Sequence, residues 1–252
     1  MSPTVHWSPP AVNLALAPDT VHVWRTATEV PPSRVAPLYG LLAPDERARA
    51  ARFLYEEDRR RYTVARGVLR SLLASYLDAE PAAVEFRYGV HGKPSLAETD
   101  GGRDVRFNLS HSYGWALHAF AVGREVGVDV ERVRPDTDIM GVARHSFSPQ
   151  EVEALTGLPP GQRREAFFNC WTRKEAFIKA HGEGIALGLS RFDVTLRPGE
   201  PAALLRFEGD PAEVSRWSMR TLDAGEGYKA ALAVEGEGWY LECWDYPAEG
   251  LM

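Results

Sequence analysis

The chain has 252 residues, of which 44% are hydrophobic and 25% are charged, as in an ordinary soluble globular protein. Its formal net charge of −6 argues against a nonspecific nucleic-acid binder, and its two cysteines, Cys170 and Cys243, exclude a disulfide scaffold and a cysteine-based zinc site. The N-terminal residues lack the charged start and apolar run of a signal peptide, and no stretch is long enough to span a bilayer. We therefore expect a cytoplasmic protein that binds neither nucleic acid nor membrane.

The first half of the sequence predicts a strand, two helices and then further strands. Residues 21–27 alternate hydrophobic and polar side chains, as in a half-buried strand. A helix begins at Pro44, which two acidic residues follow, and residues 57–77 carry apolar side chains at helical spacing. The strands expected next are 84–88, 106–110, 115–122 and 125–131.

The second half of the sequence repeats this order of helices followed by strands. Helices are expected at about 148–157 and 164–182, and strands at 191–196, 202–207, 215–222, 228–234 and 239–244. The segment GWALHAFAVG also weakly resembles the later GYKAALAVEG. The order predicts an α+β fold with a pseudo-twofold pair of similar halves, 1–124 and 125–252, each an antiparallel sheet packed with helices. Small-molecule sites often lie in clefts between such halves.

Residues 125–133, EVGVDVERV, place two carboxylates at alternate positions of a predicted strand. Asp129 and Glu131 then lie on one face of the strand, and the intervening valines point to the other. Neighbouring anions repel each other and lose hydration when they are covered. This face is therefore open to water, neutralised by an arginine such as Arg132 or Arg134, or bound to a divalent cation. Taken alone, the stretch favours water or arginine.

Residues 170–184, CWTRKEAFIKAHGEG, place Glu175 and Lys179 four residues apart on one face of a helix. A lone pair at this spacing is usually a surface ion pair. Glu175 could instead join Asp129 and Glu131 in a three-carboxylate set, which is typical of a magnesium site completed by water and phosphate oxygens. Lys179 would then lie beside the metal-bound phosphate.

Three other segments could contact phosphate. Residues 44–70 hold eight arginines against five acidic residues, which indicates a polyanionic ligand, an acidic partner or a solvated helix with internal ion pairs. In RFNLSHS, Ser110 and His111 fall at a strand end, and adjacent strand residues point to opposite faces, so phosphate binding is favoured over a nucleophilic serine. In VHGKPSL, a turn stiffened by proline projects Lys93.

The motifs GKP, FNLSHS, GVDVE and WTRKEAFIKA, in this order and spacing, resemble those of the surfactin-type (Sfp-type) 4'-phosphopantetheinyl transferases. The resemblance runs from about Pro44 to Lys179. It implies the 4'-phosphopantetheinyl transferase fold, with coenzyme A and magnesium in the cleft between two halves. It also implies a magnesium-dependent transfer of 4'-phosphopantetheine from coenzyme A to a serine of an acyl, peptidyl or aryl carrier protein, with release of 3',5'-ADP. A monomer that serves nonribosomal peptide and polyketide synthesis is the family expectation.

The resemblance also assigns roles to residues. It implies that Asp129, Glu131 and Glu175 bind magnesium, or manganese in its place, and that Asp129, Glu175 and Lys179 are catalytic. Glu175, directly or through a water, would accept the proton of the carrier serine, and Lys179 would protonate or neutralise the departing phosphate. The implied coenzyme A contacts are Arg49, Arg61, Tyr62, His91, Gly92, Lys93, Ser110, His111 and Lys179.

One position departs from the family pattern. Glu46 stands where the surfactin-type enzyme has a phosphate-contacting lysine, and we expect Arg66 or Arg52 to compensate. The carrier is expected to be acidic, so the basic helices and the apolar residues near Phe147 would form its docking surface.

Two alternatives to the transferase remain open. A metal-dependent phosphohydrolase would use the same three carboxylates on coenzyme A or another pyrophosphate, and would need no carrier. A non-catalytic homologue would only bind a carrier or coenzyme A. The second alternative predicts the loss of Asp129, Glu131, Glu175 or Lys179, and all four are present.

Overall fold

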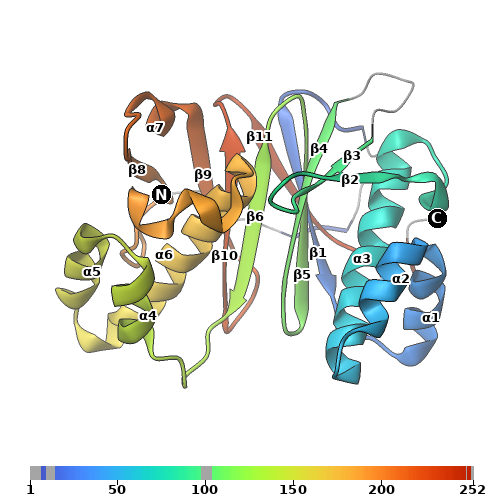
Figure 1. Cartoon of the computed structure of the whole chain (residues 1–252), viewed down its shortest axis with the longest axis horizontal. Helices are drawn as coiled ribbons and strands as arrows, with labels where there is room; N and C mark the ends of the chain where they lie inside the picture. The colour runs from blue at the N-terminus through green and yellow to red at the C-terminus, as the bar shows by residue number, and fades with distance from the viewer. Residues whose placement is uncertain (1–6, 10–14, 98–103, 248, 251–252) are drawn as a thin grey trace.

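The computed structural model describes residues 7–9, 15–97, 104–247 and 249–250, which form four layers: helices, sheet, sheet, helices (Figure 1). The larger sheet has the strand order β11-β1-β5-β4 and the other large sheet the order β6-β10-β9. The strands of the first sheet are β1 (Thr20–Ala27), β4 (Val105–Ser112), β5 (Trp115–Val122) and β11 (Tyr240–Asp245). Those of the second are β6 (Val126–Arg132), β9 (Trp217–Leu222) and β10 (Tyr228–Glu235).

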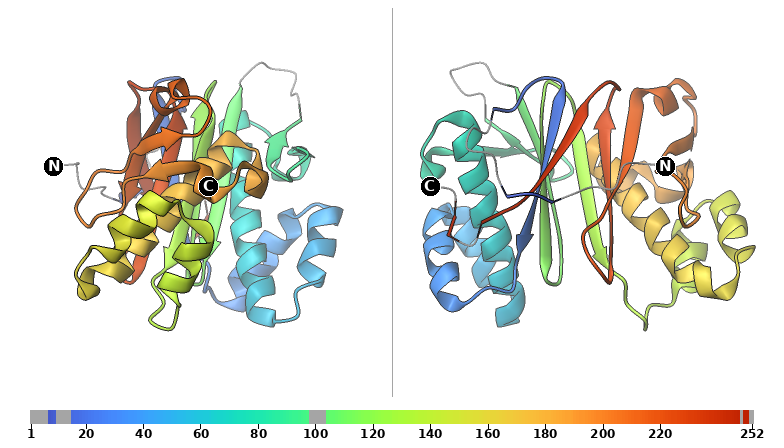
Figure 2. Two further views of the ribbon diagram at one scale, coloured as in Figure 1. Left: turned by 60° about the vertical axis from the view of Figure 1, so that its left-hand side comes forward. Right: turned by 180° about the vertical axis from the view of Figure 1, so that it is seen from behind.

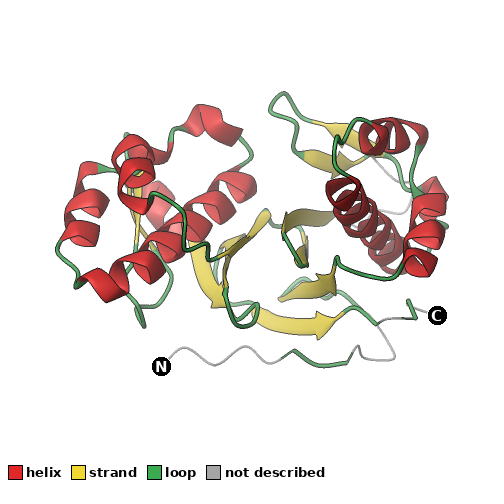
Figure 3. Ribbon diagram, turned by 90° about the horizontal axis from the view of Figure 1, so that it is seen from below, coloured by secondary structure: helices red, strands yellow, loops and turns green. Residues whose placement is uncertain are grey.

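The helices lie on the outer sides of the two sheets, as the views from the side and from below show (Figures 2 and 3). The first sheet is flanked by α1 (Pro32–Leu41), α2 (Pro44–Ala51) and α3 (Glu56–Leu77). The second is flanked by α4 (Ile139–Ser146), α5 (Pro149–Thr156) and α6 (Pro160–His181), and α7 (Ala212–Arg216) precedes β9. None of the helices within these described ranges combines the length and the apolar character needed to cross a membrane.

Short elements complete the two halves. Two hairpins lie outside the large sheets: β2 (Phe86–Tyr88) with β3 (Pro94–Leu96), and β7 (Phe192–Val194) with β8 (Leu204–Phe207). Single 3₁₀ turns are η1 (Pro81–Ala83), η2 (Gly184–Leu187) and η3 (Leu189–Arg191).

The path of the chain repeats between the two halves. In each half, a first strand (β1 or β6) precedes a 22-residue helix (α3 or α6), and two further strands of the same sheet follow (β4 and β5, or β9 and β10). The last strand, β5 or β10, lies between the other two. This confirms the predicted α+β fold with similar halves. The final strand β11 nevertheless pairs in parallel with β1, so the C-terminal end of the chain extends the first sheet. The division at residues 124 and 125 stays a prediction.

The strand β6 faces different neighbours on its two sides. Its valines are fully buried in the core that they share with β1 and β5, while Gly127 lies against α6. A Cβ atom on Gly127 would lie 2.1 Å from the Ala176 carbonyl oxygen and 2.3 Å from the Ala180 nitrogen. By alternation, Asp129 and Glu131 share the α6 face with Gly127, as predicted. That face is covered rather than open to water, because Asp129 is only 3% exposed.

The edge strands β4 and β6 are joined through side chains. Asn108, Ser110 and Ser112 of β4 accept hydrogen bonds from alternate main-chain N–H groups of β6, at 3.0, 3.4 and 3.1 Å. All three side chains are buried. Because unpaired N–H groups of a buried strand edge are costly, these oxygens stabilise the junction and fix β6 relative to β4.

The close contact at Gly127 leads to a stability prediction. We expect Gly127→Ala to destabilise the protein by more than about 2 kcal/mol, because the new methyl group would collide with the backbone of α6. Urea unfolding measures the effect. Gly161→Ala is the matched control, since a Cβ there meets no atom within 4 Å, and it should be neutral or slightly stabilising. Equal stability of the two variants would contradict the assigned contact.

A buried histidine gives a second prediction. His118 in β5 is fully buried; its Nε2 hydrogen-bonds the Ala65 carbonyl oxygen at 2.9 Å, and its Nδ1 has no partner. Burial lowers the pKa of His118 to about 4. The unfolded chain binds a proton near pH 6.5, so the free energy of unfolding should fall by up to about 1.4 kcal/mol per pH unit as the pH drops through this window.

The variant His118→Gln removes this proton uptake. Its free energy of unfolding, measured in urea between about pH 4.5 and 7, should depend less steeply on pH than that of the unaltered protein. If the free energy of unfolding of His118→Gln depended on pH as steeply as that of the unaltered protein, proton uptake by His118 on unfolding would be refuted.

Candidate active site

A buried contact joins three of the predicted motifs. Lys179 Nζ of α6 donates to Asp129 Oδ1 of β6 at 2.6 Å and to Ser110 Oγ of β4 at 2.9 Å. Ser110 Oγ in turn donates to the same Asp129 oxygen at 2.8 Å. The structure therefore brings together three predicted site residues that lie far apart in the sequence.

The second oxygen of Asp129 is unusual. Asp129 Oδ2 is buried and has no hydrogen-bond partner. An unpaired buried polar atom costs about 1–3 kcal/mol, and a carboxylate oxygen of this kind is a preferred ligand of Mg²⁺. The donor chemistry thus fits magnesium. Across the described ranges, however, no set of three or more His, Cys, Asp or Glu side chains is arranged to hold an ion. The convergence of Asp129, Glu131 and Glu175 on one ion stays a prediction.

The other two carboxylates of the predicted set are electrostatically coupled to Asp129. Glu131 accepts a hydrogen bond from Ser112 Oγ at 2.8 Å. Burial raises the pKa of Glu131, and the charge of Asp129 raises it further. Burial also raises the pKa of Glu175, again with a contribution from Asp129, while Lys179 opposes the rise. Mutual repulsion of this kind is what a bound divalent cation would relieve.

The arginines considered as partners for these carboxylates are engaged elsewhere. The Arg132 guanidinium lies 4.7 Å from the centre of the Tyr113 ring, and Arg134 pairs with Asp136 at 3.2 Å. The neutralising group beside Asp129 is Lys179 instead. Both simple alternatives, an open face and an arginine partner, are therefore wrong for Asp129.

The helix that carries Glu175 and Lys179 is anchored by a buried ion pair. Lys174 Nζ lies 2.8 Å from Glu151 Oε2, and both side chains are buried. Glu151 Oε1 also accepts from the main-chain nitrogen of Val194 at 2.9 Å. These contacts tie α6 to α5 and β7 and restrain the rotation of α6.

Positive groups gather around His111 at the end of β4. The pKa of His111 is lowered, first by loss of solvent and then by the charges of Lys179, Arg49 and Arg61. Arg61 itself pairs with Glu29 at 2.9 Å, and its Nε is buried without a partner. Cations from both halves of the chain, opposed by Asp58, therefore act on this strand end, which suits an anionic ligand.

Arg49 and Arg52 are exposed on α2 and line a cavity of about 790 Å³. The other residues that line this cavity are Asp45, Ala48, Phe53 and Tyr88. The predicted contact Tyr62 is buried beneath it, with the Arg49 guanidinium 5.5 Å from the centre of its ring. The cavity therefore combines two guanidinium groups with aromatic side chains.

Glu46, the position that departs from the family pattern, points into the protein. It is 1% exposed and forms ion pairs with both Arg66 and Arg70. Arg66 is itself buried and donates to the Tyr88 hydroxyl at 2.9 Å. Arg66 therefore compensates for the charge of Glu46 and is not presented to a ligand, whereas Arg52 lies beside Arg49 on the cavity.

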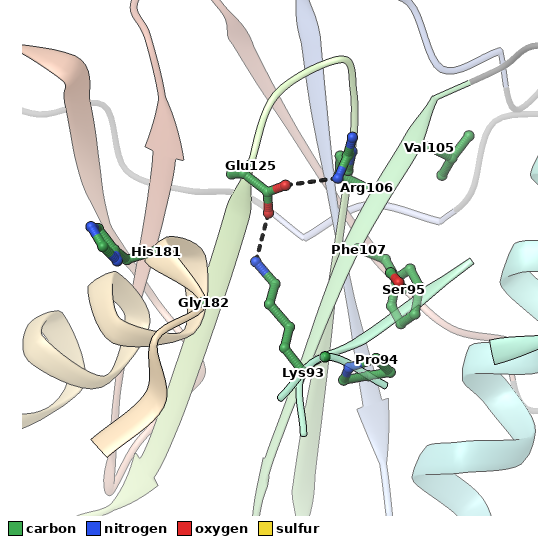
Figure 4. Close-up of a pocket in the computed structure, with 10 residues that line it drawn as sticks. Lys93, Pro94, Ser95, Val105, Arg106, Phe107, Glu125, His181 and Gly182 are labelled. Carbon is green, nitrogen blue, oxygen red and sulfur yellow. Dashed lines mark hydrogen bonds and ion pairs between the residues drawn. The ribbon is translucent and has the colours of Figure 1, made fainter. Parts of the chain in front are cut away.

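The turn that carries His91, Gly92 and Lys93 is fastened to the second half of the chain. Lys93 Nζ donates to Glu125 Oε2 at 2.6 Å and to the carbonyl oxygen of Ala180 at 2.8 Å. Glu125 also accepts from Arg106 at 2.9 Å, so it lies between two cations beside a cavity of about 240 Å³ (Figure 4). The Lys93 ammonium is thus bound to protein groups, and His91 and Gly92 are exposed.

Sequence reasoning missed several of these residues. Alternation placed Asn108 on the face of Ser110 without giving it a role, and the same signal could have added Ser112 to that face. No local pattern could have paired Glu125 with Lys93, because the contact joins segments 32 residues apart.

Comparison with known proteins shows the family of this chain. The family model "4'-phosphopantetheinyl transferase superfamily" matches residues 125–233, and "4'-phosphopantetheinyl transferase, N-terminal" matches residues 29–122. The chain is 42% identical over 240 residues to the 4'-phosphopantetheinyl transferase HetI of Nostoc sp.. The aligned residues make up 95% of this chain and 98% of that protein.

Two further relatives come from Bacillus subtilis. The chain is 31% identical to a 4'-phosphopantetheinyl transferase and 28% identical to the 4'-phosphopantetheinyl transferase Sfp, each over 77% of this chain and 82% of the relative. The chain therefore belongs to the 4'-phosphopantetheinyl transferase family. It is a transferase that moves 4'-phosphopantetheine from coenzyme A to carrier proteins, which confirms the predicted reaction class.

Proposed function

We propose that the chain is a surfactin-type enzyme and that its magnesium-dependent transfer takes place at Asp129, Glu131, Glu175 and Lys179. The observation that supports this assignment is the contact of Asp129 with Lys179 and Ser110, which leaves one buried carboxylate oxygen unpartnered. The similarity to the Sfp transferase over 77% of the chain supports the branch of the family.

Magnesium, or manganese in its place, would be held by oxygens of Asp129, Glu131 and Glu175. When bound, it supplies positive charge that stabilises the pyrophosphate of coenzyme A during transfer. The fit rests on the chemistry of the donors and on the unpartnered oxygen of Asp129.

The reaction joins the serine oxygen of the carrier to the phosphorus that bears the pantetheine arm. The P–O bond to the second phosphate breaks, and 3',5'-ADP leaves with the electron pair. Glu175 accepts the serine proton, and its raised pKa makes it a stronger base than an exposed glutamate. Lys179 presents its ammonium to the departing phosphate and offsets the developing negative charge.

The remaining predicted contacts would bind the coenzyme. Arg49 and Arg61, with His111 between their charges, would hold the nucleotide phosphates. The surfactin-type enzyme has a phosphate-contacting lysine where this chain has Glu46. Arg52 would contact the phosphate instead, because it lines the same cavity as Arg49. Lys93 would act by holding the turn of His91 and Gly92 in place, rather than as a free cation.

The acceptor would be an acyl, peptidyl or aryl carrier protein with acidic residues around its serine. Phe147 itself is 4% exposed and stacks on Phe167, so it adds little to a docking surface formed by the apolar residues near it. Leu54 and Tyr55, which are 86% and 68% exposed beside the arginines of α2, provide an apolar and basic surface of the required kind. We also propose that the enzyme acts as a monomer in the cytoplasm, without membrane or nucleic acid.

The reaction is tested by mass spectrometry of an apo carrier incubated with the protein, coenzyme A and magnesium. The carrier should gain the mass of one phosphopantetheine arm. Release of 3',5'-ADP in the absence of a carrier would instead indicate a phosphohydrolase.

In the same assay, Asp129→Ala should abolish transfer, because it removes both the partner of Lys179 and the unpartnered oxygen. Asp136→Ala is the control, since that exposed carboxylate pairs only with Arg134 among the contacts described. Thermal unfolding should show that both variants are folded. Near-normal transfer by folded Asp129→Ala would refute the assignment of the site.

The reassignment of the arginines is tested by Arg52→Ala. The variant should raise the KM for coenzyme A about tenfold with little change in kcat, as expected for the loss of one charged hydrogen bond made equally in the ground and transition states. Arg191→Ala removes an exposed arginine that pairs with Glu208 in the other half of the chain, and it should leave KM unchanged. A KM in Arg52→Ala that matches this control would place the phosphate elsewhere.

A further inference from the structure

The turn between β4 and β5 contains a strained tyrosine. Tyr113 has φ +49°, in the left-handed region, which is costly for residues with a Cβ and uncommon for bulky side chains. Among the described residues, the other non-glycine with positive φ is Asp78 (φ +51°), at the C-terminal cap of α3. Aspartate tolerates this conformation at a helix end, so Tyr113 is the one that needs an explanation.

The backbone around Tyr113 is held from two other strands. Thr28, after the end of β1, donates from its hydroxyl to the Tyr113 carbonyl oxygen at 2.5 Å and from its main-chain nitrogen to the Gly114 carbonyl oxygen at 2.9 Å. The Gly114 nitrogen donates to the hydroxyl of Tyr228 in β10 at 3.2 Å. The surrounding structure therefore imposes the strained conformation, a pattern that is concentrated at functional sites.

The Tyr113 ring contacts two cations from different halves of the chain. The Arg132 guanidinium, at the end of β6, lies 4.7 Å from the ring centre, and the Arg61 guanidinium of α3 lies 5.4 Å from it. Both distances are within the range of cation–π attraction. Arg61 also pairs with Glu29, Glu57 and Asp58, so the ring joins Arg132 to a cation that these carboxylates already hold.

The position of these cations relates them to the proposed site. Ser112, the residue before Tyr113, holds Glu131 by a hydrogen bond of 2.8 Å, and Arg132 follows Glu131 directly. Arg61 has one buried N–H group, at Nε, that lacks a partner. The Tyr113 ring thus joins Arg132, the residue after a predicted metal ligand, to a guanidinium with one unused N–H group.

We infer that Tyr113 is a positioning residue for the coenzyme: its strained backbone aims the ring so that Arg61 and Arg132 are held together to receive a phosphate-bearing ligand. This inference rests on the proposed function of the same site.

The inference predicts that strain relief and loss of binding occur together. In Tyr113→Gly and Tyr113→Asn, which tolerate positive φ, the dissociation constant and the KM for coenzyme A should rise roughly tenfold, as for the loss of two cation–π contacts, with kcat changed less than about twofold. The Tm should not fall by more than about 2 °C, because relief of strain offsets the lost ring contacts. Calorimetry with coenzyme A measures binding independently of turnover.

Two further variants separate the ring from the backbone. Tyr113→Phe keeps the ring and should bind coenzyme A within about twofold of the unaltered protein. Asp78→Gly relieves a similar strain far from the proposed site, and it should leave both binding and KM unchanged. Unaltered coenzyme binding in both Tyr113→Gly and Tyr113→Asn, or an equal loss in Tyr113→Phe, would overturn the inference.

The variants of Asp129 and of Tyr113 test the proposed site and the role of Tyr113 separately. Transfer activity that persists in Asp129→Ala would refute the proposed site, whatever the Tyr113 variants do. If Asp129→Ala is inactive and Tyr113→Gly binds coenzyme A normally, the proposed site stands and only the role of Tyr113 is wrong.

Discussion

The close packing of α6 on β6 at Gly127 determines the geometry on which the rest of the site depends. A glycine is required there, because any Cβ would collide with main-chain atoms of Ala176 and Ala180. The absence of a side chain lets the helix approach the strand closely, and the helix then carries Lys179, one turn after Glu175, to Asp129. The resulting contact of Lys179 with Asp129, at 2.6 Å, is a direct consequence of this approach.

The second constraint is the polar junction between the two halves. Each sheet has one edge strand at this junction, and the side chains of Asn108, Ser110 and Ser112 satisfy the main-chain donors that β6 would otherwise leave unpaired. Ser110 and Ser112 also donate to Asp129 and Glu131. The residues that join the halves are therefore the same residues that orient the carboxylates, so the site can form only when the halves are packed together.

The site combines groups that oppose stability. Burial raises the pKa values of Glu131 and Glu175, which means that their charged forms are disfavoured where they lie, and Asp129 has an unpartnered oxygen. The left-handed backbone of Tyr113 adds strain to the adjacent turn. Other buried charges are paired, as Glu46 is with two arginines and Lys174 is with Glu151. Two of the buried atoms without a partner, Asp129 Oδ2 and Arg61 Nε, belong to predicted site residues.

The sequence by itself determined the local structure and the class of the protein. Alternation predicted β1, β4, β5, β6 and β10 and the faces of β4 and β6, helical spacing predicted α3 and α6, and four motifs in register identified the family. It missed α1, which carries a proline inside ten residues, and the short α4, because neither has a long periodic pattern.

Tertiary structure alone decided which charges meet. Glu46 points inward and pairs with Arg66, and Lys93 pairs with Glu125. Lys179, rather than an arginine, lies beside Asp129, and β11 pairs with β1 in the first sheet. Periodicity records which face a residue occupies, since that depends only on its neighbours along the chain. The partner across that face depends on how distant elements pack, and no local pattern encodes it.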